Sequence, residues 1–67
     1  MKSVIKILNM DSHEDSKKIQ NVIVQNEGII ASQTSVNRKE VTIVYDELSV
    51  NIKKIIEIIE DLGYLVI

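Results

Sequence analysis

The chain has 67 residues, a net charge of −2 and no cysteine, which excludes disulfides, thiol nucleophiles and thiolate metal sites. This length allows one small domain, spanning residues 1–67, around one core. The acidic balance and the absence of Phe and Trp argue against nucleic acid as a partner. No apolar run approaches roughly 20 residues, so we expect no membrane insertion and a cytoplasmic protein.

The first predicted element is a strand over residues 3–8, which are rich in β-branched side chains. Alternation places Ile5 and Ile7 on one face of this strand. Val4 and Leu8 then point to the opposite face, which would be exposed in a sheet covered on one side only.

The second predicted element is a helix over residues 12–26. Ser12 followed three residues later by Asp15 resembles a capping box, with an acid in place of the usual Glu or Gln. Apolar side chains then recur at helical spacing, at Ile19, Val22 and Ile23. Gly28 suits the left-handed conformation that ends many helices.

Two strands are predicted next, over residues 29–36 and 40–45, joined by a polar hairpin turn at residues 37–39. The second of them alternates clearly. Its predicted inward side chains are Val41, Ile43 and Tyr45.

A second helix is predicted after Ser49, which can act as its N-cap, and before Gly63, which can stop it. Residues 64–67 then form a short last strand. The helix carries a broad apolar stripe, made of Ile52, Ile55, Ile56, Ile59 and Leu62.

The predicted order is therefore strand, helix, strand, strand, helix, strand. Two helices with one apolar stripe each can cover only one face of a four-stranded sheet. The sequence predicts an α+β, ferredoxin-like βαββαβ two-layer sandwich with an antiparallel sheet.

Several motifs along the whole chain, taken in order, resemble those of heavy-metal-associated domains. They are Met10, Lys17-Lys18-Ile19, Val41-Thr42-Ile43-Val44-Tyr45-Asp46 and the ending from Ile55 to Gly63-Tyr64. In that family the first turn reads Met-x-Cys-x-x-Cys. Ser12 and Asp15 stand here in the positions of the two cysteines.

The resemblance implies a role like that of a copper chaperone or of an amino-terminal domain of a metal-transporting ATPase. It therefore implies metal homeostasis as the function. It also implies a metal-transporting P-type ATPase or a related metal-binding domain as the partner, and a weak homodimer is compatible with it.

The resemblance does not extend to the metal. Cu(I) selects soft ligands such as thiolates, and the turn has no cysteine, so we do not expect Cu(I) binding. Zn(II) accepts imidazole and carboxylate, so the candidate metal residues by motif position are Asp11, Ser12, His13 and Asp15, with Glu14 beside them. A helix N-terminus favours anions and disfavours cations. We therefore interpret Ser12 and Asp15 first as a helix cap, with zinc ligation as the alternative.

Two further residues are expected beside the turn. Met10 is predicted to fill the core beneath it, as a flexible thioether side chain. The resemblance places Tyr64 next to the turn, where the tyrosine shields the metal site in bacterial members, and its ring can also simply pack with the hydroxyl at the surface.

Other functions remain open alternatives. The chain can be an interaction or regulatory module that uses strand edges or the outer sheet face, with Val4, Leu8 and Val44. An ACT-like ligand-binding domain has the same element order, although the first turn lacks the glycine that would admit a ligand. We set an enzyme aside for two reasons. No catalytic triad is plausible, and Arg38, the only arginine, lies in the predicted hairpin and not in a loop that could bind phosphate.

Overall fold

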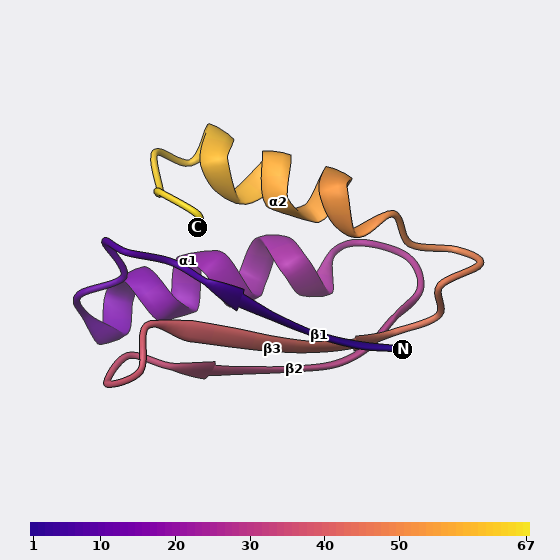
Figure 1. The fold of residues 1–67 in the computed structure, drawn as a ribbon, viewed down its shortest axis with the longest axis horizontal. Helices are drawn as coiled ribbons and strands as arrows, with labels where there is room; N and C mark the ends of the chain where they lie inside the picture. The colour runs from indigo at the N-terminus through magenta and orange to yellow at the C-terminus, as the bar shows by residue number, and fades with distance from the viewer.

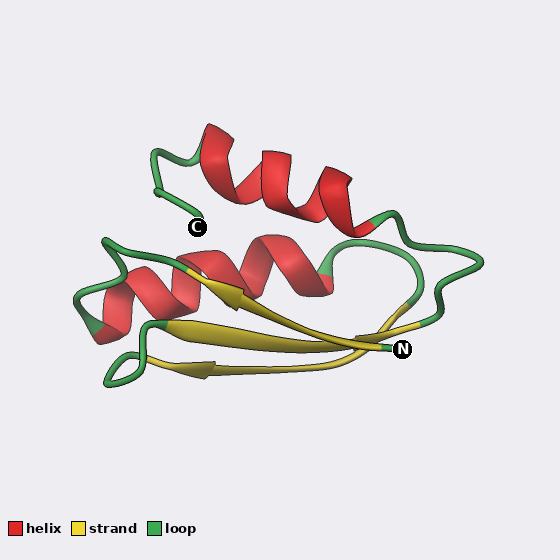
Figure 2. Cartoon of the chain, viewed as in Figure 1, coloured by secondary structure: helices red, strands yellow, loops and turns green.

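The computed structural model describes every residue from Met1 to Ile67. The elements are β1 (Lys2–Lys6), α1 (His13–Val24), β2 (Ile29–Ser35), β3 (Glu40–Tyr45) and α2 (Ile52–Asp61). The three strands form an antiparallel sheet in the order β1-β3-β2. Figure 1 shows both helices on the same side of this sheet, and Figure 2 separates the helical layer from the sheet by colour.

The register of the sheet places the apolar side chains on its helix-facing side. In the pairing of β1 with β3, Ile5 lies opposite Val41 and Ser3 lies opposite Ile43. Val41, Ile43 and Tyr45 are all buried, as the alternation of residues 40–45 predicts. The two-layer α+β sandwich with both helices on one face is therefore confirmed.

The predicted four-stranded sheet is wrong in one respect, because residues 64–67 form no continuous fourth strand. They meet the end of β1 at a single bridge between Ile7 and Val66. The backbone N–H of Leu65 is bonded to the side-chain oxygen of Asn9, 2.8 Å away, instead of to a strand. This side-chain bond takes the place of the next ladder bond, so the pairing stops after one bridge.

The first helix begins as predicted but ends earlier. Ser12 is its N-cap, in extended conformation, and α1 ends at Val24 instead of residue 26. Asn26 lies beyond the last turn and donates its side-chain amide to the carbonyls of Val22, at 2.7 Å, and Ile23, at 3.4 Å. These bonds satisfy carbonyl groups that have no partner within the helix.

The second helix begins later than predicted, because Asn51 and not Ser49 is its N-cap. The Asn51 side chain accepts a hydrogen bond from the N–H of Lys53. Ser49 instead lies in a turn, where its hydroxyl contacts the carboxylate of Asp46. Leu62, placed in the apolar stripe from sequence, is the C-cap residue and is 45% exposed.

The core lies between the sheet and the two helices and is almost entirely aliphatic. Its buried side chains are Ile5, Ile7, Met10, Ile19, Ile23, Val41, Ile43, Tyr45, Val50, Ile55, Ile59 and Tyr64. Met10 is fully buried, as expected from its position before the first helix. The strands β1 and β3 and both helices therefore contribute to one continuous cluster, against which β2 packs the partly buried Ile29.

Three connections gather at one end of the molecule: the β1–α1 loop, the β2–β3 hairpin turn and the segment that follows α2 (Figure 1). Hydrogen bonds link all three. Lys39 in the hairpin turn contacts Asp11, and Tyr64 after α2 contacts Asp15. The fold thus brings distant parts of the chain to the loop that the sequence singles out.

The two glycines offer a matched test of backbone strain and crowding. Both have positive φ angles, +94° at Gly28 and +97° at Gly63. A Cβ at Gly28 would lie 2.7 Å from Val50 Cγ2, whereas a Cβ at Gly63 would meet nothing within 4 Å. We expect Gly63→Ala to cost about 1–2 kcal/mol of unfolding free energy for its φ alone. Gly28→Ala should cost about 1–3 kcal/mol more, from the added crowding.

Urea denaturation of the two variants and the native protein measures these free energies. Equal destabilisation by the two substitutions would contradict the close packing of Gly28 against the turn before α2.

Candidate functional site

The loop between β1 and α1 is organised around the carboxylate of Asp15. One oxygen, Oδ2, accepts hydrogen bonds from the backbone N–H groups of Asp11, at 3.1 Å, and Ser12, at 3.2 Å. The other oxygen, Oδ1, accepts the hydroxyl of Tyr64 at 2.7 Å. In return, the Ser12 hydroxyl oxygen accepts the N–H of Asp15 at 3.2 Å. The predicted capping box is therefore present in full.

Asp11, the second candidate carboxylate, is paired with a cation of the protein itself. The Lys39 ammonium contacts Asp11 Oδ1 and also donates to the carbonyl of Leu8 at 3.0 Å. Both side chains are partly open to solvent, with Lys39 39% and Asp11 66% exposed. An ion pair in this setting orients the loop but adds little stability.

The remaining candidate ligands do not join the two aspartates around one point. His13 and Glu14 are the first residues of α1 and are both exposed. Nowhere in the chain do three His, Asp or Glu side chains lie close enough together to hold one ion. Structural zinc sites take four ligands and catalytic ones three. In the observed arrangement the residues of this loop do not fit a zinc ion.

Met10 and Tyr64 flank the loop in different ways. Met10 is fully buried beneath it, so its sulfur belongs to the core. Tyr64 is also buried, at 8% exposed, but its hydroxyl reaches the loop and donates to Asp15. The tyrosine thus packs its ring and, at the same time, ties the segment after α2 to the start of α1.

The bond between Tyr64 and Asp15 shifts the titration of both groups. The Tyr64 hydroxyl, followed by the N–H of Asp11 and the bonds with Ser12, lowers the pKa of the Asp15 carboxyl from its ordinary value. Burial, together with the hydrogen bond and the negative charge of Asp15, raises the pKa of Tyr64 to about 12. Asp15 is therefore an anion and Tyr64 a neutral donor at neutral pH.

Two residues of this site were not identified from the sequence. The sequence pattern places Lys39 in a polar turn and assigns no role to Asn9. Asn9 donates to the Gly63 carbonyl at 3.2 Å and accepts from the Leu65 N–H at 2.8 Å. Both act across long separations in the chain, which local patterns do not report.

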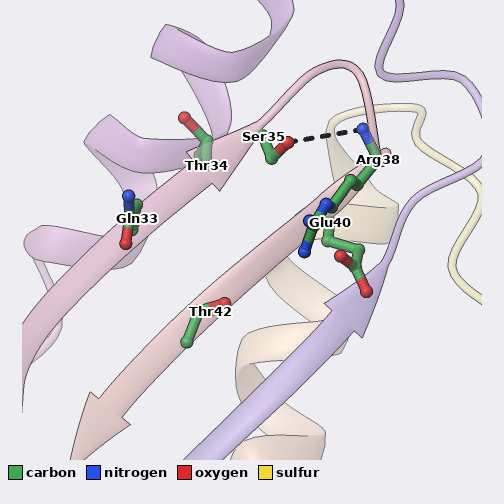
Figure 3. Close-up of a pocket in the computed structure, with 6 residues that line it drawn as sticks. All are labelled: Gln33, Thr34, Ser35, Arg38, Glu40 and Thr42. Atoms are coloured by element: carbon green, nitrogen blue, oxygen red, sulfur yellow. Dashed lines mark hydrogen bonds between the residues drawn. The ribbon is translucent and has the colours of Figure 1, made fainter.

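A polar recess lies apart from this loop, on the side of β2 and β3. Its lining residues are Gln33, Thr34, Ser35, Arg38, Glu40 and Thr42 (Figure 3). Within it, the backbone N–H of Arg38 donates to the Ser35 hydroxyl at 3.3 Å. The recess has no hydrophobic lining residue, whereas sites for small molecules are mostly apolar. It gives the ACT-like interpretation no support.

The order of elements, the shape of the first loop and the buried Met10 agree with one known family. Residues 4–64 match the family described as the heavy-metal-associated domain. The chain belongs to this family. The first loop of this member contains no cysteine, because the chain has none.

Solved structures similar to this chain share its fold at low sequence identity. A CopZ metallochaperone is 18% identical, with a TM-score of 0.95 and full coverage of both chains. Oxidized MerP from Ralstonia metallidurans CH34 is 13% identical, with a TM-score of 0.92, covering 100% of this chain and 93% of that one. A copper binding domain from HMA7, a P-type ATPase, is 20% identical, with a TM-score of 0.90, covering 98% and 89%.

A search of curated proteins gives no match. Neither helix of the structure has the length and apolar character needed to cross a membrane.

The link between Tyr64 and Asp15 predicts a specific change in titration. Tyr64→Phe removes the hydroxyl that contributes most to lowering the Asp15 pKa, so this pKa should rise toward its ordinary value. Because the folded-state pKa is lowered, Asp15 contributes stability above its unfolded pKa and loses it as pH falls through the folded value. The variant should therefore lose less stability on acidification.

NMR titration of the Asp15 carboxyl carbon measures the shift directly. Tyr45→Phe is the matched control, because the Tyr45 hydroxyl bonds to Ser3 and not to Asp15. If Asp15 titrates identically in the Tyr64 variant and the native protein, the bond does not exist in solution.

Proposed function

We propose that this protein is a cytoplasmic, non-catalytic component of metal homeostasis that docks on metal-handling proteins without holding Cu(I) in its own loop. One observation supports the proposal above the others. The loop that carries the cysteine pair elsewhere in the family is here closed by contacts within the protein, centred on Asp15 and Asp11. The family fold is kept while the soft ligands are absent.

The partner we propose is a metal-transporting P-type ATPase or a related metal-binding domain. The support comes from the family and from the kinds of protein that share the fold, which include a metallochaperone and a domain of a P-type ATPase. Docking through the surface around the first loop requires no metal on this chain.

Zinc binding at the loop is proposed to be weak. Asp15 already accepts three hydrogen bonds, and Asp11 is paired with Lys39. Only His13 and Glu14 are left without such partners, and adjacent residues at a helix start point in different directions. An ion bound there would keep most of its water ligands and exchange readily.

A second candidate function, a regulatory interaction module, is favoured by the sheet face that no helix covers. Val4 is 54% exposed and Leu8 is 46% exposed on this face. In the segment paired with β1, Leu65 and Ile67 are 59% and 71% exposed. Sedimentation velocity separates the candidates, because self-association through this face would depend on protein concentration and not on metal.

The central experiment follows backbone amide shifts during titration with Cu(I) and Zn(II). For the native protein we expect no Cu(I)-dependent shift in residues 10–15 and, with Zn(II), only small shifts near His13. The double substitution Ser12→Cys with Asp15→Cys should restore stoichiometric Cu(I) binding. In the native loop each of these side chains reaches the backbone N–H of the other residue, so positions 12 and 15 are close enough for two thiolates to bind one ion, and a helix N-terminus favours thiolates.

Ser12→Cys alone is the control, because a single thiolate should bind Cu(I) much more weakly than the pair. Tight Cu(I) binding by the native protein would contradict the proposal. Docking is tested separately, by adding an unlabelled copper-binding domain of a metal-transporting ATPase to the labelled protein. Shifts around the first loop that persist in the presence of a chelator are expected, and the absence of any shift would exclude this partner.

A further inference from the structure

The side chain of Lys39 reaches from the β2–β3 hairpin turn across to the first loop. Its ammonium joins two oxygen atoms that belong to that loop and its approach: the carboxylate of Asp11 and the carbonyl of Leu8. Leu8 and Asp11 are 31 and 28 residues away from Lys39 in sequence. One cation thus connects the end of β1, the loop and the hairpin.

The backbone of Lys39 is held in an unusual conformation by two hydrogen bonds. Lys39 is the one residue other than glycine with a positive φ, at 55°. Its N–H donates to the carbonyl of Val36 at 3.2 Å, and its carbonyl accepts the N–H of Ile7 at 2.8 Å. A lysine in the left-handed region is uncommon, and such residues persist where the surrounding contacts hold them.

We propose that the Lys39 ammonium is the resident cation of the 10–15 loop, which closes the loop in place of a metal ion and keeps divalent cations away from Asp11. The contacts of Lys39 lie within the protein and do not depend on which partner the protein docks on. A positive charge is still present at the loop, but it is supplied covalently by the chain.

The charge of Lys39 disfavours a second cation at Asp11. A divalent cation that approaches Asp11 must either displace the ammonium or share the carboxylate with it, and two positive charges at contact distance repel each other. The pair is partly exposed, so it stabilises the folded state only slightly. Its effect should therefore appear in the order of the loop and in cation affinity more than in global stability.

Lys39→Gln tests the proposal, because glutamine removes the charge while bearing the same constraint at positive φ. Hydrogen exchange of the Asp11 and Ser12 amides should be about two- to fivefold faster in this variant, which is the range expected for loss of an exposed ion pair. At equal Zn(II) concentration, the amide shifts at Asp11 should be larger than in the native protein. Lys39→Arg should preserve both native properties.

Lys54→Gln is the matched control, since it removes one lysine charge from α2, away from the loop, and should change neither measurement. Exchange rates and zinc shifts in Lys39→Gln equal to those of the native protein would overturn the proposal. So would equal changes in the Lys54 control, because these would show an effect of net charge alone. Global unfolding is monitored in parallel, so that slower or faster exchange is assigned to the loop.

Discussion

The arrangement at the loop end depends on the carboxylate of Asp15, which accepts from two backbone N–H groups and from a tyrosine at the far end of the chain. The two backbone bonds orient the start of α1. The third bond, from Tyr64, fixes the segment after α2 against that start. A carboxylate is suited to this task, because it accepts several hydrogen bonds at once and its charge is favoured at a helix N-terminus.

The fold of the family is present here without cysteine ligands for a metal. At positions 12 and 15 the resemblance to the family implies a cysteine pair, which a bound metal would link by coordination. Here Ser12 and Asp15 are linked by reciprocal hydrogen bonds, and neither depends on a metal or on redox conditions. The core beneath the loop is aliphatic and contains Met10, so it places no demand on the ligands above it. The bonds of this loop and the packing of the core therefore require no metal ion.

Most of the fold could be predicted from the sequence, because periodicity and caps are local signals. The burial of Val41, Ile43 and Tyr45 and the capping box at Ser12 followed directly. The errors arose where a local signal had a competitor. Both Ser49 and Asn51 can act as N-caps. In the structure Asn51 caps α2, while the Ser49 hydroxyl bonds to Asp46. The last segment forms only one bridge with the chain after β1, because the Asn9 side chain accepts the Leu65 N–H that would otherwise continue the ladder.

The candidate site was harder to predict, because its decisive contacts join residues far apart in sequence. Asp11 could be identified as a possible ligand from its position, but its pairing with Lys39 depends on a positive φ that no sequence pattern reports. A cluster of acids beside one histidine indicates a metal only while those acids lack other partners. Once Lys39 and Tyr64 are placed, Asp11 is paired with a lysine and Asp15 accepts three hydrogen bonds. The contacts of Asp11 and Asp15 therefore depend on the hairpin turn and on the segment after α2, and not on the loop alone.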